Sequence, residues 1–283
     1  MTIDTDNNFA NPVVVSETQV EINKNNLDGL EALKEYFIKI EVENSGEIVW
    51  SEIKEFSSFY TVELVNYPST DNIEICATVS YISTRLNSSS RTAIFMHEYT
   101  KSKSSWGVTN IRDTLLKEGY LCIAIDFRGH GSSTSIADIS VLIDRPWLLR
   151  QDFDATLDYL ESRDLERSDE IVVFGASMGA CVATAVSSYE NVIGGIAASS
   201  VEFIARNTQV VPFQPKGMFY IAGELDKNVN RNIDFEADAI ELCNCTKEPS
   251  KYEIKLATRA NDVDLLDGDI ELTNKAIDWI RNL

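Results

Sequence analysis

The chain has 283 residues, of which 44% are hydrophobic and 25% charged, as is typical of a folded globular protein. A formal net charge of −20 excludes nucleic acid and anionic membranes as partners, because like charges repel. No apolar run approaches the roughly 18 residues that a membrane span needs, and the first residues do not resemble a secretory signal. With five cysteines, an odd number that argues against a disulfide framework, the sequence predicts a cytoplasmic protein with buried thiols.

Residues 1–58 are predicted to form an N-terminal extension ahead of a main domain at 59–283. Within the extension, "DGLEALKEYFIKI" (28–40) places apolar residues at helical spacing. Asp28 with Glu31 three positions later is typical of a capping box, so a short helix is expected here.

From residue 60 onward, strand-like runs alternate with amphipathic or apolar helical runs. Strands are expected at 60–67, 73–82, 91–99, 121–127, 170–175, 192–200, 217–224 and 251–257. Helices are expected at 107–120, 146–163, 178–190, 235–244 and 271–283. This alternation predicts an α/β fold with a mostly parallel central sheet covered by helices on both faces. In such sheets, reactive groups gather beyond the carboxyl ends of the strands.

The strongest motif is "VVFGASMGA" (172–180), which contains G-x-S-x-G centred on Ser177. It follows an apolar strand and opens a helix, the context that a nucleophile elbow requires. Gly175 and Gly179 leave room for a strained turn that lifts the serine hydroxyl above the sheet. The adjoining helix N-terminus favours developing negative charge.

With this elbow, four further segments in order resemble the α/β-hydrolase superfamily over residues 60–283, most closely its lidless bacterial esterases and dienelactone-hydrolase-like branch. These segments are "AIFMHEYTKSKSSW", "GYLCIAIDFRGHGSS", "DFDATLDYLE" and "YIAGELDKNV". The resemblance implies an α/β-hydrolase fold. The short connector 201–217 implies that no large lid domain is present.

The resemblance also implies roles for individual residues. Ser177 becomes the candidate nucleophile and Asp226 the candidate acid of a catalytic triad. The backbone N–H groups of Met178 and of Glu98 or Tyr99 become the candidate oxyanion hole. No cofactor and no metal are implied.

The family's catalytic histidine is expected in the loop after the last strand, where this chain reads "NDVDLL" (261–266) with Asn261 at the histidine position. The only histidines are His97 and His130, both upstream of the elbow. An amide has no titratable nitrogen near neutral pH, so Asn261 cannot activate the serine. His97 is the better of the two histidines as an alternative base.

Two carboxyls in the same loop are a further possibility for the base. Asp262 or Asp264 would act directly, but an ordinary aspartate with a pKa near 4 is a weak base. Burial would raise that pKa.

Three functional hypotheses follow. The first is a serine hydrolase that cleaves an ester or thioester of a small acyl substrate with an incomplete or unconventional triad. The second is a catalytically inactive protein of the same fold, a pseudoenzyme that binds a ligand or a protein partner. The third is a lyase or cyclase that uses the same pocket without an acyl-enzyme.

Overall fold

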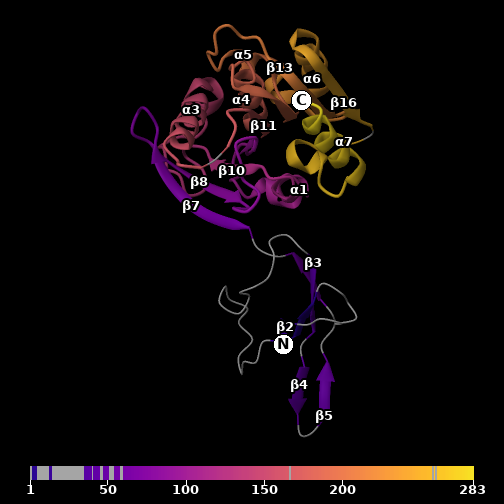
Figure 1. Ribbon diagram of the computed structural model, residues 1–283. Coiled ribbons are helices and arrows are strands. Elements are labelled where there is room, and N and C mark those ends of the chain that lie inside the picture. Colours follow the sequence, from indigo (N-terminus) through magenta and orange to yellow (C-terminus); the bar gives the residue numbers. More distant parts are fainter. Residues whose placement is uncertain are drawn as a thin grey trace. The chain divides into compact units, whose positions relative to one another are not determined.

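The computed structural model describes residues 60–283 except Glu166, Ala257 and Arg259, together with the backbone of six short N-terminal strands. The chain divides into two compact units, residues 1–61 and 62–283. The division falls three residues after the boundary expected from the sequence. Figure 1 shows both units, and each is described by itself.

In the N-terminal unit, strands form one four-stranded antiparallel sheet and one hairpin. The sheet has the order β2-β1-β3-β6, and the hairpin pairs β4 with β5. Their bounds are β1 Thr2–Asp4, β2 Val13–Val14, β3 Glu35–Lys39, β4 Glu41–Asn44, β5 Glu47–Trp50 and β6 Lys54–Ser57.

The helix expected at 28–40 is wrong over its second half. Glu35–Lys39 forms strand β3, which pairs with β1 on one side and β6 on the other. The "YFI" within this run consists of aromatic and β-branched residues that pack well on a pleated surface, so pairing with two neighbours overrides the helical spacing. Residues 28–34 lie outside the described residues.

The main unit is built on an eight-stranded sheet with the order β16-β13-β12-β11-β9-β10-β8-β7. The pairs from β10 through β9, β11, β12 and β13 to β16 are parallel, and β8 runs antiparallel to β10. The bounds are β7 Thr61–Pro68, β8 Glu74–Tyr81, β9 Thr92–Met96, β10 Leu121–Asp126, β11 Ile171–Ala176, β12 Val192–Ala198, β13 Lys216–Gly223 and β16 Lys247–Lys255. The predicted mostly parallel sheet is confirmed.

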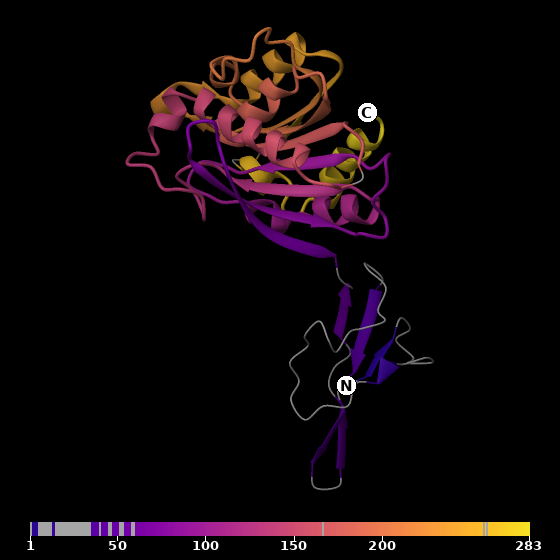
Figure 2. The ribbon, with the colours of Figure 1, turned by 60° about the vertical axis from the view of Figure 1, so that its left-hand side comes forward.

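Helices cover both faces of this sheet, as expected (Figure 1; Figure 2 shows the same arrangement turned by 60°). Helices α1 and α7 contact each other on one face, while α3, α4, α5 and α6 form a continuous layer on the other. The bounds are α1 Ile111–Lys117, α2 Val141–Asp144, α3 Trp147–Glu161, α4 Met178–Val186, α5 Glu202–Arg206, α6 Phe235–Cys245 and α7 Ile270–Arg281. Three 3-10 turns, η2 Ser105–Val108, η3 Val229–Arg231 and η4 Asp262–Leu265, and a small β14–β15 ladder, Lys227–Asn228 with Ile233–Asp234, complete the unit.

Two absences in the described part of the chain bear on function. Between β12 and β13 the chain forms only the five-residue helix α5, so no large lid is inserted there. None of the described helices has the length and apolar character needed to cross a bilayer.

The carboxyl ends of the central strands finish level with one another. Gly175 of β11 is paired with Met96 of β9, and Ala176 with Ala198 of β12. Because these strands are parallel, the residues that follow them meet at a single edge of the sheet. The site is built at this edge.

Candidate active site

Ser177 occupies a strained turn between β11 and α4. Its φ of 48° and ψ of −111° lie outside the regions that a serine normally adopts. Its N–H donates to the carbonyl of Ala198 at 2.8 Å, which fixes the turn to the neighbouring strand. Strain of this kind costs about 1–3 kcal/mol and persists where surrounding structure enforces it. This backbone geometry matches the elbow expected from the motif.

The two glycines of the motif are required by close backbone contacts. A Cβ at Gly175 would lie 2.3 Å from the carbonyl oxygen of Gly179, and one at Gly179 would lie 2.4 Å from that of Met96. Any larger residue would therefore push α4 away from the strands. The G-x-S-x-G spacing thus has a steric cause.

The side chain that meets the Ser177 hydroxyl is the carboxyl of Asp262. The Ser177 hydroxyl lies close enough to this carboxyl to lower its pKa. Asn261, at the position expected for the base, is exposed and its side chain makes no capping bond to η4. The structure therefore moves the position facing the serine by one residue.

The cause of this shift is the backbone at the start of η4. Asn261 is extended, with φ −133° and ψ 169°, whereas Asp262 is left-handed, with φ 56°. Successive side chains of an extended segment point in opposite directions, so an alignment error of one residue exchanges an outward side chain for an inward one. Asn and Asp both tolerate positive φ, so the sequence does not distinguish the two positions.

Asp226 lies in the turn after β13 and is buried, as a catalytic acid would be. Its Oδ2 accepts a hydrogen bond from the Ser199 hydroxyl at 3.1 Å. The Ser199 hydroxyl in turn accepts the backbone N–H of Asp262 at 2.9 Å. Asp226 is thus connected to the loop of Asp262 through a serine rather than through an imidazole.

Ser199 was missed by sequence reasoning. It follows β12, which neighbours the strand of the nucleophile, and the rule that polar residues beyond parallel strands meet at one edge would have selected it. The run "AASS" contains no recognised motif, so composition alone did not single it out.

A third carboxyl, that of Glu98, lies close to Asp262. Burial, followed by the charges of Glu98 and Asp226, raises the pKa of Asp262 to about 8, and the hydrogen bond from Ser177 opposes the rise. Burial also raises the pKa of Asp226 to about 6, against the effect of the Ser199 hydrogen bond. Two buried oxygens, Oε2 of Glu98 and Oδ1 of Asp262, meet no hydrogen-bond partner within the described residues.

Neither histidine contacts the serine. His97 is fully buried, with Nδ1 2.6 Å from the carbonyl of Glu98 and Nε2 accepting the N–H of Phe127 at 3.0 Å. Both ring nitrogens are therefore occupied, and burial lowers the pKa of His97 to about 4. The lone pair of His97 is thus already used by the Phe127 N–H, which counts against His97 as an alternative base.

His130 packs against His97, with ring centroids 5.0 Å apart, and its Nδ1 lies 3.0 Å from the carbonyl of Arg128. Its Nε2 is buried and finds no partner among the residues that the structure describes. The two rings together fill the space beneath the loop that follows β9.

A cavity of about 310 Å³ opens at the serine. Most of its lining is apolar. The lining residues are Tyr99, Leu142, Ile143, Ser177, Met178, Cys181, Val201, Ile204, Asn228, Arg231, Ile233 and Phe235. Arg231 is the single charged side chain among these described residues. The volume and the apolar character suit a small organic ligand.

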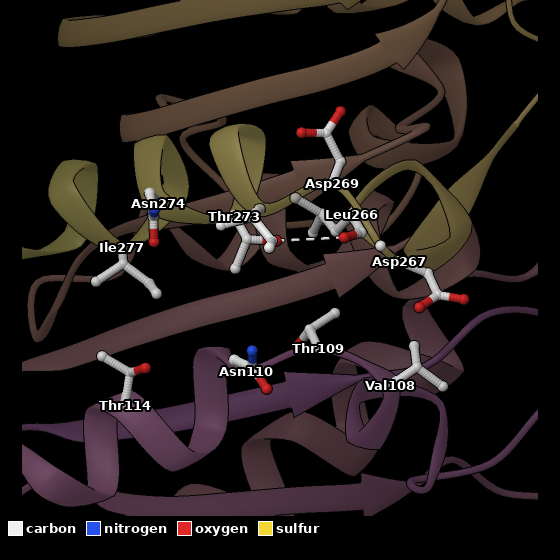
Figure 3. A pocket seen from close by; sticks show the side chains of 12 residues that line it. Val108, Thr109, Asn110, Thr114, Leu266, Asp267, Asp269, Thr273, Asn274 and Ile277 are labelled. Atoms are coloured by element: carbon white, nitrogen blue, oxygen red, sulfur yellow. Dashed lines mark hydrogen bonds between the residues drawn. The ribbon is translucent and has the colours of Figure 1, made fainter.

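A second cavity of about 350 Å³ lies between α1 and α7, away from the serine (Figure 3). Thr109 and Thr273 face it, and the Thr273 hydroxyl donates to the carbonyl of Leu266 at 3.2 Å. Its polar groups are mainly hydroxyls, amides and two aspartates, with no nucleophile held by a base. Among the described residues, no cluster of three or more His, Cys, Asp and Glu side chains has the arrangement of metal ligands.

Comparisons with solved structures place the chain among hydrolases in fold. An esterase from Pyrococcus furiosus superposes with a TM-score of 0.59 and 23% identity, covering 79% of this chain and 93% of the esterase. A predicted CIB-like hydrolase from Thermoplasma acidophilum gives a TM-score of 0.58 and 19% identity, covering 80% of this chain and 100% of that chain. A ferulic-acid-bound Est1E from Butyrivibrio proteoclasticus gives 0.56 and 15%, covering 76% and 98%. At these identities the likeness shows the fold alone.

A search of curated proteins finds no match. The family model of serine aminopeptidase, S33, matches residues 91–251, which is more than half of the chain. The match contains the Ser177 elbow and Asp226 and ends before the loop of Asp262. The chain therefore belongs to the S33 serine aminopeptidase family of α/β hydrolases.

Proposed function

We propose that the protein is a serine hydrolase that cleaves esters or thioesters through Ser177, with the Asp262 carboxylate as the base that replaces an imidazole. The observation that carries this proposal is the proximity of the Ser177 hydroxyl to the Asp262 carboxyl, whose pKa burial and neighbouring carboxyls raise to about 8. A general base works best when its pKa lies near the working pH, and this carboxyl is far more basic than an ordinary aspartate.

Proton transfer would follow the ordinary order of acyl transfer. As Ser177 Oγ attacks the substrate carbonyl carbon, its proton moves to the Asp262 carboxylate. Protonated Asp262 then gives that proton to the leaving oxygen or sulfur as the acyl-enzyme forms. A water molecule repeats the sequence from the other side, releasing the acid and restoring Ser177.

Backbone N–H groups would stabilise the oxyanion. Met178 opens α4, and the first N–H groups of a helix have no intrahelical acceptor. The Glu98 carbonyl is directed toward His97, and in a trans peptide the next N–H, that of Tyr99, points the opposite way. Tyr99 also lines the cavity with Ser177, which supports its N–H rather than that of Glu98 as the second donor.

The carboxyls around Asp262 contribute to its basicity. Glu98 and Asp226 carry no ion pair within the described residues, and their charges oppose ionisation of Asp262. The carboxylate, once formed, therefore has a strong tendency to accept a proton. In this arrangement Asp226 acts on the base through its charge and through Ser199.

The cavity lining favours a substrate with an apolar acyl group. Leu142, Ile204 and Phe235 would contact methylene groups, and Arg231 is suited to a carboxylate. The proposed substrates are therefore medium-chain esters, with a preference for those that carry a distal carboxylate. A matched pair tests this: p-nitrophenyl hydrogen adipate should have a lower KM than p-nitrophenyl hexanoate. Arg231→Gln should remove the difference, whereas exposed Arg145→Gln, outside the lining, should keep it.

The test of catalysis is covalent labelling together with a pH profile. A fluorophosphonate probe should label the wild-type protein and not Ser177→Ala. Ester hydrolysis should rise with pH to a midpoint near 8, because the base must lose its proton. A midpoint well below 7 would indicate another base. Absence of both labelling and hydrolysis would favour the ligand-binding protein over the enzyme.

A further inference from the structure

Ser199 lies at the junction of three strand-end loops. It follows β12 directly, is fully buried, and its N–H donates to the carbonyl of Ile221 in β13 at 2.9 Å. Its φ of 55° is left-handed. The residue is therefore fixed to the sheet in an unfavourable conformation that the surrounding strands must enforce.

The hydroxyl of Ser199 makes two long-range hydrogen bonds. It donates to Asp226 Oδ2 at 3.1 Å, 27 residues along the chain, and accepts the N–H of Asp262 at 2.9 Å, 63 residues along. Ser187, by contrast, bonds the carbonyl of Thr184 within its own turn. Both partners of Ser199 belong instead to the proposed catalytic loops.

The bond to Asp262 acts at the point where that loop changes direction. Asp262 is left-handed, and this conformation turns its carboxyl toward Ser177 while Asn261 stays outside. A donor–acceptor bond at the Asp262 peptide therefore selects which side chain of the loop meets the serine. Asp226, by accepting the Ser199 proton, directs the hydroxyl lone pairs toward that peptide.

We propose that Ser199 is a positioning residue, which transmits the orienting effect of Asp226 to the peptide of Asp262 and so holds the base against Ser177. The inference rests on the proposed function, because it gives Asp262 its catalytic orientation. It extends the site to a chain of four residues, Ser177–Asp262–Ser199–Asp226. In this chain Ser199 orients Asp262 by accepting its backbone N–H.

The main experiment is Ser199→Ala with Ser200→Ala as the matched control. Ser200 is the next residue, is also buried, and its hydroxyl lies 3.2 Å from Thr184 Oγ1 rather than against Asp226 or Asp262. Misplacing a reacting group by about 1 Å costs on the order of 100-fold in rate. Ser199→Ala should therefore lower kcat by about that factor with KM unchanged. Ser200→Ala should keep kcat, and equal losses in both variants would overturn the proposal.

Non-additivity supplies a second readout. If Ser199 and Asp226 act as one unit, the double variant Ser199→Ala/Asp226→Asn should lose no more kcat than the worse single variant. A merely structural role for Ser199 predicts that the two losses multiply. That multiplication would overturn the proposal.

A titration separates this inference from the proposed function. The carboxyl carbon of Asp262 can be followed by nuclear magnetic resonance without any turnover. The groups that act on it are Glu98 after β9, Asp226 after β13, Asp264 in its own loop and the hydroxyl of Ser177.

In Ser199→Ala the midpoint of Asp262 should fall for two reasons of the same sign. First, the freed loop exposes the Asp262 carboxyl to water. Second, Asp226 loses the hydrogen bond that lowers its pKa, so it stays protonated and neutral up to a higher pH and no longer raises the pKa of Asp262. An unchanged midpoint overturns the role of Ser199. A lowered midpoint in a protein that hydrolyses no ester supports the role of Ser199 while the proposed function fails.

Discussion

Buried carboxyls occur in two neighbouring parts of the sheet edge, and they are treated in opposite ways. After β10, Asp126 accepts the N–H groups of Lys103 and Ser132 and forms an ion pair with the Lys103 ammonium. Asp152 on α3 forms an ion pair with Arg128 at 2.7 Å. Around Ser177, the carboxyls of Glu98, Asp226 and Asp262 form no ion pair within the described residues.

The two most comparable members are Asp152 and Asp262. Burial raises the pKa of Asp152 to about 6, and the Arg128 guanidinium opposes the rise, so the pair is charged at neutral pH. For Asp262, burial acts together with two neighbouring carboxyls, and the pKa reaches about 8. The neighbouring charges therefore separate the two aspartates, because Arg128 opposes the rise in the pKa of Asp152 whereas Glu98 and Asp226 add to that of Asp262.

The two groups of carboxyls therefore have different roles, one in stability and the other in chemistry. The paired carboxyls hold the loops that follow β7 and β10, since Arg128 also reaches Asp71 at 2.6 Å. The unpaired carboxyls weaken the fold but keep one group poised to exchange a proton near neutral pH. Perturbed groups of this kind concentrate at functional sites, which supports the assignment of the serine end as the site of chemistry.

The largest expected change in activity follows from substitution of Asp262. Asp262→Asn keeps the shape of the side chain but removes the proton acceptor, so kcat should fall by roughly 10²–10⁴-fold, the usual contribution of a general base. Asp264→Asn is the matched control, because Asp264 is an exposed carboxyl two residues further on. Steady-state hydrolysis measures both. Equal activity of the two variants would contradict the role of Asp262.

The paired region should respond in stability rather than in activity. Arg128→Met leaves Asp152 buried without its cation and should lower the free energy of unfolding by about 3–5 kcal/mol. Urea denaturation measures this loss. Adding Asp152→Asn to the same variant should recover part of the stability, because the uncompensated charge is gone. A loss below 1 kcal/mol (roughly the value of a surface pair) would show that this pair is not the structural element described here.

Introducing a histidine at either position tests whether residue 261 or residue 262 faces the serine. Asp262→His should keep measurable hydrolysis and move the midpoint of the pH profile from near 8 toward the ordinary histidine pKa of about 6.5. Asn261→His adds the same group one residue earlier on the exposed side and should leave the profile unchanged. Histidine also tolerates the positive φ of Asp262. A gain in activity from Asn261→His alone would show that the base belongs at position 261, as the sequence predicted.

A further expected effect is on the free energy of unfolding as a function of pH. The unfolded pKa of Asp262 is near 3.9, and the folded value is about 8, so the folded state binds the extra proton between these values. The stability contributed by that proton is fully present below about pH 4 and is lost as pH rises through 8.

Asp262→Asn removes this dependence. Its Tm should equal that of the wild type near pH 4.5 and exceed it at pH 9, by about 2–4 °C for each kcal/mol. Differential scanning fluorimetry at the two pH values measures the change. A Tm difference that is constant with pH would contradict the raised pKa.

Much of the fold could be predicted because its signals are local. The apolar run before Gly175 and the small residues around Ser177 identify strand, turn and helix within nine positions. The strand β3 could not be predicted in this way. Phe37 continues the helical spacing of Leu30 and Leu33, and only pairing with β1 and β6 selects the strand.

The sequence selects Ser177, Asp226 and the loop after the last strand as the candidate site, and the structure brings these three to one edge of the sheet. Within that loop the choice between Asn261 and Asp262 depends on one positive φ, which either residue tolerates. His97 was a reasonable candidate because it ends the strand beside that of the nucleophile. Its two hydrogen bonds, to Glu98 and Phe127, arise from residues that no spacing rule connects.

The sequence by itself therefore determined the α/β-hydrolase fold, the elbow of Ser177 and the absence of a histidine after the last strand, since each depends on the order of residues along the chain. Only the tertiary structure decided that Asp262 faces the serine and that Ser199 connects Asp262 to Asp226. It also decided that burial and neighbouring carboxyls raise the pKa of Asp262. These features arise from groups up to 164 positions apart that meet at one edge of a parallel sheet, as between Glu98 and Asp262 (262 − 98 = 164). Proximity of this kind sets burial and charge, and burial and charge set reactivity.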